Sequence, residues 1–492
     1  MDELIPICDA TLGSLPSNVR IPRYNRNQLT AGIVHIGVGN FHRAHQAWYL
    51  HRLFEEGLEY EWAIIGAGVR DHDFVQREKL LAQDCLTTLV ELAPAGISAE
   101  ICGSMIGYAP VERGNVSLIA QMAEPAVRII SLTVTEGGYF ADPTSGAFDR
   151  SHPDIVHDAA NPETPRTAFG AIVAALKLRR EHESGPFSVL SCDNLRGNGT
   201  VTRRTVVSLA RMSDHGLADW IETHCSFPNS MVDCIVPATG AKAIELARGF
   251  GINDAVPVTH EDFRQWVIED DFCAGRPDLS KAGVVFSNDV HAFEMMKLRI
   301  LNGGHQIIAA AGDLLGFETI AEVMGSSSIR RLLDKVMVEE IIPHVSAVPG
   351  VTPEEYFKLI KRRFSNELIG DTTRRVAYDG SSRQPGFIVP SILDGLSSGV
   401  SVNGLALVSA IWARYCQGKR EDGGTIEAND PNWSELKAVA ERAKHNPVSW
   451  LEMGNYYGDI SHHQGFADAF IMWLNNLNSK GLDGTISAYT DG

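Results

Sequence analysis

A short apolar strand that runs into two glycines and then into an amphipathic helix constrains this chain most strongly. The segment reads Gly32-Ile-Val-His-Ile-Gly37-Val-Gly39-Asn-Phe-His42. Glycines at such a turn let the backbone approach a pyrophosphate, and the following helix N-terminus supplies N–H groups. His42 stands where the usual third glycine would be, so the motif alone is a weak indicator. The residues expected to contact a dinucleotide here are Gly37, Gly39, Asn40 and Phe41.

A second apolar strand strengthens this prediction. It covers residues 62–69 and ends in Arg70-Asp71-His72-Asp73. An acid after the second strand of a dinucleotide-binding fold normally binds the adenosine ribose hydroxyls and selects NAD over NADP. Asp71 and Asp73 are the candidates, although Asp71 also suits a helix N-cap. Arg70 and His72 beside them suit a 2′-phosphate, so NAD is expected and NADP is the alternative.

Two further strands end in groups that suit ligand binding. Residues 127–135 lead into Glu136 and Gly137, and the strand at 188–191 leads towards Asn194. Open α/β sheets bind ligands at the carboxyl ends of their strands. We therefore expect Glu136 and Gly137 to contact the cofactor. Asp233 lies in an apolar loop, where it is either a satisfied structural acid or a ligand for substrate hydroxyls.

The apolar spacing changes near residue 290, from strands alternating with helices to helices alone. The predicted fold class is α/β, with a Rossmann-type N-terminal domain and a mostly α-helical C-terminal domain. The first domain, with an N-terminal arm, is expected over residues 1–288. A mainly helical substrate and catalytic domain is expected over residues 289–492.

The helix that opens the second domain carries a polar face around Lys297, Asn302 and His305. On an α-helix Lys297 and His305 lie about 80° apart, so these groups share one broad face. Gly303 and Gly304 cost roughly 1 kcal/mol each relative to Ala, but they leave space for something to approach the backbone. Such groups can abstract a proton, stabilise an oxyanion and orient a hydroxyl. The alternative is a solvated helix face with one core histidine.

Composition limits the partners. The 492 residues carry 43 basic and 61 acidic side chains, a formal net charge of −18, which disfavours nucleic acid and anionic membranes. No apolar run approaches the roughly 20 residues of a membrane span, and the acidic N-terminus lacks signal-peptide features, so a cytoplasmic protein is expected. The eight cysteines form no C-x-x-C pair, so neither a metal site nor a disulfide framework is expected.

Taken together, these segments resemble the long-chain mannitol dehydrogenase family, which includes mannitol and arabinitol dehydrogenases and fructuronate and tagaturonate reductases. The resemblance runs from about residue 30 to the C-terminal helices. Each matching segment is weak alone, but the combination is highly specific. The segments are residues 37–45, Thr133-Val-Thr-Glu-Gly-Gly-Tyr139, Ser191-Cys-Asp-Asn194, Phe227-Pro-Asn-Ser-Met-Val-Asp233 and Lys297-x4-Asn302-x2-His305.

The resemblance implies NAD-dependent, metal-independent and reversible oxidation of a polyol of the mannitol, arabinitol or sorbitol type to a ketose. It gives Lys297 the role of general base and gives Asn194 and Asn302 that of stabilising the alkoxide. It gives His305 the role of orienting the substrate and Glu294 that of relaying protons to water. The residues that fall on substrate-contacting positions are Asp233, Arg375 and Arg383.

Three positions depart from the family pattern. Cys234 replaces the usual Arg, Arg383 stands where many polyol enzymes have Lys, and His72 occupies an acidic position, leaving Asp73 as the matching acid. The first two leave the substrate open. Because a planar guanidinium suits a carboxylate, an NAD-dependent sugar-acid reductase is the alternative. A third reading is an inactive NAD-binding sensor. No interface stripe stands out, so a monomer or weak homo-oligomer is expected.

Overall fold

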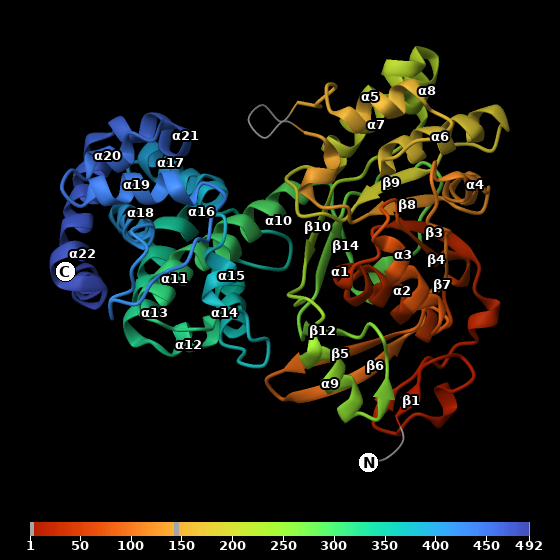
Figure 1. Ribbon diagram of the computed structural model, residues 1–492, viewed down its shortest axis with the longest axis horizontal. Coiled ribbons are helices and arrows are strands. Elements are labelled where there is room, and N and C mark those ends of the chain that lie inside the picture. Colours follow the sequence, from red (N-terminus) through yellow and green to blue (C-terminus); the bar gives the residue numbers. More distant parts are fainter. Residues whose placement is uncertain (1–3, 142–146, 492) are drawn as a thin grey trace. The chain divides into compact units, whose positions relative to one another are not determined.

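The computed structural model describes residues 4–141 and 147–491 (Figure 1). The chain forms two compact units, residues 1–291 and residues 292–492. A parallel sheet organises the first unit, and helices build the second. The described part of the expected N-terminal arm contains two short strands, β1 (Ile5–Pro6) and β2 (Val19–Arg20).

Five parallel strands form the main sheet of the first unit, in the order β7-β4-β3-β8-β9. The chain starts at the central strand β3, builds outward to β7, and then returns to build outward on the other side. This is the order of a Rossmann-type doubly wound sheet, as the sequence predicted. The strands are β3 (Ala31–Ile36), β4 (Ala63–Ala67), β7 (Met105–Tyr108), β8 (Ile129–Leu132) and β9 (Ser188–Ser191).

Helices cover both faces of this sheet because successive strand residues point to opposite sides. Val34 and Ile36 belong to one core with α4, α6, α7 and α8, whereas Ile33 belongs to another with α1 and α2 (Figure 1). The helices are α1 (Asn40–Ala44), α2 (Gln46–Glu55), α3 (Asp73–Leu81), α4 (Val116–Ala123), α5 (Pro153–Ala160), α6 (Ala168–Glu181), α7 (Asn198–Ser213), α8 (His215–His224) and α9 (Ala241–Gly249).

Smaller sheets complete the first unit. A hairpin of β5 and β6 is flanked by β12 and β2, β10 pairs with β13 and β13 with β14, and β1 pairs with β11. These pairings join segments far apart in the sequence, so they link the N-terminal arm to later parts of the unit. The bounds are β5 (Thr87–Ala93), β6 (Gly96–Cys102), β10 (Ser230–Asp233), β11 (Ile252–Asn253), β12 (Val258–Glu261), β13 (Gln265–Ile268) and β14 (Val285–Phe286).

The helices from α10 onward include three π-helical turns, η6 (Lys297–Asn302), η7 (Met337–Ile341) and η9 (Gln384–Ile388). The long last helix is interrupted at Gly481, where φ is 71°. The α-helices are α10 (Val290–Met296), α11 (Gly303–Leu314), α12 (Ile320–Gly325), α13 (Ser327–Val336), α14 (Pro353–Phe364), α15 (Thr373–Ala377), α16 (Gly380–Arg383), α17 (Val389–Ser398), α18 (Asn403–Tyr415), α19 (Trp433–Ala443), α20 (Val448–Leu451), α21 (Gly454–Tyr457) and α22 (Gln464–Thr490).

Candidate functional site

The turn after β3 requires its first glycine. Gly37 has φ of +99°, and a Cβ at this position would lie 2.1 Å from the carbonyl oxygen of Thr133. The Thr133 hydroxyl also donates to the Gly37 carbonyl at 2.6 Å, so the residue that follows β8 supports the turn directly. Gly39 is the N-cap of α1 and donates its N–H to the Gly37 carbonyl at 2.7 Å. Backbone without side chains therefore borders the space above the turn, as a bound pyrophosphate requires.

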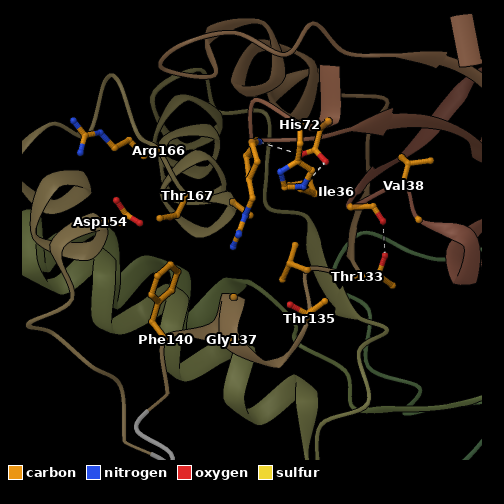
Figure 2. A pocket seen from close by; sticks show the side chains of 18 of the residues that line it. Ile36, Val38, His72, Thr133, Thr135, Gly137, Phe140, Asp154, Arg166 and Thr167 are labelled. Carbon is orange, nitrogen blue, oxygen red and sulfur yellow. Dashed lines mark hydrogen bonds and ion pairs between the residues drawn. The ribbon is translucent and has the colours of Figure 1, made fainter. Parts of the chain in front are cut away.

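A pocket of about 660 Å³ opens at this turn (Figure 2). Its volume is within the usual range for small-molecule and cofactor sites. Figure 2 shows Ile36 and Val38 towards one end and Asp154 and Arg166 towards the other. The residues expected to contact a cofactor that line this pocket are Gly37, Gly39, Arg70, Asp73 and Gly137.

The other four expected cofactor residues do not line the pocket. Asn40 is engaged by its neighbours, because its amide donates to the Pro237 carbonyl and accepts from Arg43. Phe41 stacks on His45, with ring centroids 4.9 Å apart. The remaining two, Asp71 and Glu136, are exposed.

Asp73 is the acid that the fold places at the pocket. Its carboxylate accepts the backbone N–H of Arg70 at 3.0 Å and lies 3.5 Å from the His72 ring. A Cβ on Gly68 would lie 2.3 Å from the Asp73 Cβ, so a glycine at the end of β4 makes room for this side chain. The geometry therefore favours Asp73 over Asp71 as the ribose-binding acid.

Sequence reasoning missed Asp193, which holds the loop after β8 in place. Its carboxylate accepts the N–H groups of Val134 and Thr135 at 2.8 and 3.0 Å and the Tyr139 hydroxyl at 2.7 Å. Its place at the carboxyl end of a strand was the available signal. Sequence reasoning also missed most of the pocket's far wall, which includes Thr135, Phe140, His152, Asp154, Arg166 and Thr167.

Two buried histidines lie beneath the glycine turn. The ring of His42, at the third position of the glycine motif, stacks on His35 with centroids 3.4 Å apart and an interplanar angle of 12°. His35 is also bonded to the hydroxyls of Ser131 and Thr133 at 2.8 and 2.9 Å. Burial lowers the pKa of His35 to about 3 and that of His42 well below its usual value. A neutral aromatic pair thus supports the turn where other chains have a third glycine.

The polar helix predicted from the sequence contains a π-helical turn. Glu294 is buried in α10, Lys297 is the first residue of η6 and Asn302 is its last. The N–H of Gly303 is shared between the carbonyls of Ile300 and Leu298, three and five residues back. The α-helical wheel assumed from the sequence is therefore not the geometry that relates Lys297 to His305.

The protein's own Phe364 occupies the space left by the second glycine. A Cβ on Gly304 would lie 3.3 Å from Cε2 of Phe364. The same ring stacks on His305, with centroids 4.2 Å apart and an interplanar angle of 18°. Burial, the largest cause, lowers the pKa of His305 to about 3. His305, which directly follows Gly304, is therefore a neutral histidine whose ring is held by the ring of Phe364.

Two predicted arginines lie near this histidine. Arg375 makes a bidentate ion pair with Asp371, with both N···O distances 2.5 Å, and its side chain is 62% exposed. Arg383 donates to the carbonyl of Val376 at 2.6 Å. Behind burial and the opposing charge of Asp371, the charges of Arg375, Arg363 and Arg383 each lower the pKa of His305. Arg363, which is buried, is a residue that sequence reasoning missed.

The remaining predicted residues belong to the first unit and follow its strands. Asn194 is exposed and comes just after β9. Asp233 is the last residue of β10 and is buried. Cys234, where the family usually has Arg, is partly buried and bonds weakly to the carbonyl of Ile235, with the sulfur 3.9 Å away.

In residues 4–141 and 147–491, three or more His, Cys, Asp or Glu side chains nowhere gather as they would to hold a metal ion. Over the same residues, none of the helices combines the length and apolar character needed to cross a membrane.

Comparisons with known proteins agree with this architecture. The model of the mannitol dehydrogenase Rossmann domain matches residues 31–281, and that of the mannitol dehydrogenase C-terminal domain matches residues 289–478. Mannitol 2-dehydrogenase of Cereibacter sphaeroides is 53% identical over 472 residues, which cover 96% of this chain and 99% of that protein.

Two solved structures are similar over nearly the whole length. The ternary complex of Pseudomonas fluorescens mannitol 2-dehydrogenase with NAD and D-mannitol has a TM-score of 0.87 at 37% identity, covering 99% of this chain and 100% of that one. Substrate-free D-sorbitol dehydrogenase has a TM-score of 0.90 at 36% identity, covering 98% and 100%.

Proposed function

The chain belongs to the mannitol dehydrogenase family, and on this premise we propose that it is an NAD-dependent polyol dehydrogenase. It oxidises a secondary alcohol of an open-chain polyol of the mannitol, arabinitol or sorbitol type to the ketose, reversibly and without a metal. The observation that carries the proposal is the 53% identity to a mannitol 2-dehydrogenase along nearly the whole chain.

The cofactor pocket fits a dinucleotide with a free ribose. Gly37 and Gly39 leave room for a pyrophosphate, and Asp73 is the acid for the ribose hydroxyls. The carboxylate would repel a 2′-phosphate, which favours NAD over NADP, although Arg70 beside it has the opposite charge. When bound, NAD accepts the hydride that leaves the carbinol carbon.

The groups of this chain handle the hydroxyl proton. An alcohol is a very weak acid, so the base must be neutral and close, and burial is the usual means of lowering a lysine pKa from about 10.4 towards 7–8. Lys297 is buried, and we assign it this role. Glu294, also buried three residues earlier, passes the proton towards water.

The oxygen that loses its proton needs hydrogen-bond donors. The amide of Asn302, and by family resemblance that of Asn194, donates to the developing alkoxide, at roughly 3 kcal/mol of transition-state stabilisation per donor. His305, neutral and held by Phe364, orients a substrate hydroxyl. Asp233, Arg375 and Arg383 are assigned to the remaining hydroxyls.

NADH formation tests the proposal. Purified protein is mixed with NAD and a panel of mannitol, arabinitol and sorbitol, with and without a strong chelator. We expect NADH to form at a rate that the chelator leaves unchanged. Loss of activity with the chelator would contradict the lysine mechanism. NADH binding without turnover on any polyol or ketose would instead indicate a sensor.

A sugar-acid reductase is the second candidate, and the arginines favour it. The charges of Arg363, Arg375 and Arg383 each lower the pKa of His305, so the three guanidinium groups lie close to it. A guanidinium binds a carboxylate through two parallel hydrogen bonds. The same assay distinguishes the candidates: consumption of NADH on fructuronate or tagaturonate, with no reaction on polyols, would assign the protein to the sugar-acid branch.

A further inference from the structure

The π-helical turn η6 changes which side chains share a face of the polar helix. On an uninterrupted α-helix, Asn302 would lie about 140° and His305 about 80° from Lys297. A π-turn takes up one extra residue within a helix. If the extra residue adds no net rotation, Asn302 lies about 40° and His305 about 20° from Lys297 around the helix axis. The turn therefore brings the three groups onto one narrow stripe.

The hydrogen bond that defines the turn spans this stretch. The N–H of Gly303 donates to the carbonyls of Ile300 and Leu298, three and five residues back, whereas an α-helix would pair it with Arg299. Lys297 and Asn302 are themselves five residues apart, the spacing at which residues of a π-turn lie above one another. The extra residue thus falls between the proposed base and the proposed alkoxide donor.

Two other π-turns meet η6 at Gly303. A Cβ on Gly303 would lie 3.7 Å from the carbonyl oxygen of Phe387 in η9 and 4.0 Å from Cδ1 of Ile341 in η7. Each neighbour has its own bond of five-residue span, from Ile342 N–H to Met337 and from Val389 N–H to Gln384. The three turns therefore adjoin at Gly303, where a methyl would be in ordinary contact with both neighbours.

Both neighbouring turns are anchored elsewhere. In η7 the buried carboxylate of Glu340 accepts the N–H groups of Gly404 and Leu405 at 2.6 and 2.8 Å, which fixes the turn to the start of α18. Arg383 directly precedes η9 and donates to Val376, which ties that turn to the end of α15. Both π-turns that contact η6 are therefore held by hydrogen bonds to other helices of the second unit.

We infer that the π-turn over Lys297–Asn302, held by η7 and η9 at Gly303, is the positioning device that aligns Lys297, Asn302 and His305 for proton transfer. Leu298 and Gly303 act in it as positioning residues through the backbone bond between them. The inference rests on the proposed function, because it presumes that these three side chains take part in the chemistry.

Inserting one alanine between Leu298 and Arg299 tests the inference, because the turn already takes up one extra residue and a second would rotate Asn302 and His305 by about 100° away from Lys297. We expect kcat for polyol oxidation to fall by at least about 100-fold, with NADH affinity, measured by fluorescence, little changed. The matched control Leu298→Ala keeps the residue number and should retain kcat. A folded insertion variant as active as this control would overturn the inference.

A second pair of variants keeps the chain length. At Gly303, Ala adds one methyl at ordinary contact distance, whereas Val forces branches against η7 and η9. Gly303→Val should lower kcat with little change in KM for the polyol, while Gly303→Ala should not. Equal kcat in the two variants would contradict the inference. So would an experimental structure in which Gly303 N–H pairs with Arg299.

Lys297→Ala, assayed in parallel, distinguishes a failure of the positioning role from a failure of the proposed lysine base. If Lys297→Ala is inactive and the variant with alanine inserted after Leu298 is active, the positioning role is wrong and the proposed function stands. If Lys297→Ala keeps near-normal turnover, the lysine base itself is wrong.

Discussion

At the residue scale, the proposed chemistry depends most on one buried lysine. Replacing Lys297 with Ala removes the base, so we expect turnover to fall by about 10²–10⁴-fold. The affinity for NADH should hardly change, because the cofactor pocket is lined by residues of the first unit. Steady-state kinetics and NADH titration measure both quantities. Lys281→Ala, at a half-exposed lysine paired with Asp278, is the matched control.

Asp73 and Asp71 offer a matched pair for cofactor choice. Only Asp73 lines the pocket, so Asp73→Ala should raise the ratio of kcat/KM with NADP to that with NAD by about tenfold or more, corresponding to about 1.4 kcal/mol. Asp71→Ala, at an exposed position, should leave the ratio unchanged. A shift in the Asp71 variant alone would reverse the assignment.

Replacing Phe364 should change how kcat/KM for the polyol depends on pH. Phe364→Leu keeps apolar volume but removes the ring stacked on His305, so the imidazole should become more exposed to water and its pKa should rise from about 3. We expect kcat/KM for the polyol to decline below about pH 6 in the variant, where the wild type shows no decline from this group. Phe357→Leu, on the same helix α14, is the control.

The residues that sequence alone could place are those whose partners are close in the chain. Asp73 follows its strand closely, and Lys297, Asn302 and His305 lie within one short stretch, so local spacing was enough to predict them, and their roles stay a prediction. Phe364 was missed because it lies far from Gly304 in the sequence, and no local pattern indicates that its ring occupies the space beside that glycine.

At the scale of elements, the strand and glycine turn of β3 were predictable, because a strand buried on both faces and a required positive φ leave a short apolar run and a glycine in the sequence. The confirmed Rossmann order of the sheet follows from such units. The π-turn was not predictable, because one extra residue in a helix changes no composition. The parallel pairing of β12 with β5 depends on contacts between distant segments, which periodicity does not report.

The glycine turn gives an element-scale prediction. In Gly37→Ala the new Cβ would collide with the carbonyl of Thr133, so the turn must shift away from β8. We expect NADH affinity to drop by at least about tenfold, corresponding to about 1.4 kcal/mol, while far-ultraviolet circular dichroism stays native. Gly249→Ala in α9, outside the pocket, is a suitable control, because a Cβ there meets nothing within 4 Å. Equal affinities in the two variants would contradict this role of Gly37.

At the scale of the whole molecule, the sequence boundary near residue 288 remains a proposal. Residues 1–288 should fold alone and bind NADH, because the glycine turn, Asp73 and their supporting cores all lie within them. Residues 289–492 should not bind NADH. Fluorescence titration of the two separately expressed pieces measures this, and an unfolded first piece would count against the boundary.

Acid should destabilise the molecule through its buried histidines. His35, His260 and His305 each have a pKa lowered by burial from 6.5 to about 3. Between these values the unfolded chain binds protons that the folded chain does not, so their contribution to stability is complete above about pH 6.5 and is lost progressively towards pH 3. The melting temperature of the protein should therefore fall as the pH is lowered from about 6.5 towards 3. His260→Gln should weaken the fall and the exposed His463→Gln should not.

The π-turn also bears on how such a chain can diverge. If one extra residue between Lys297 and Asn302 aligns the site, then natural variation in this stretch is limited in length more than in identity. Substitutions at Leu298 or Leu301 would be tolerated where the side chains still pack. A further insertion that continued as α-helix would turn everything beyond it through about 100°. Among descendants of this gene, the segment should therefore accumulate replacements and remain free of insertions.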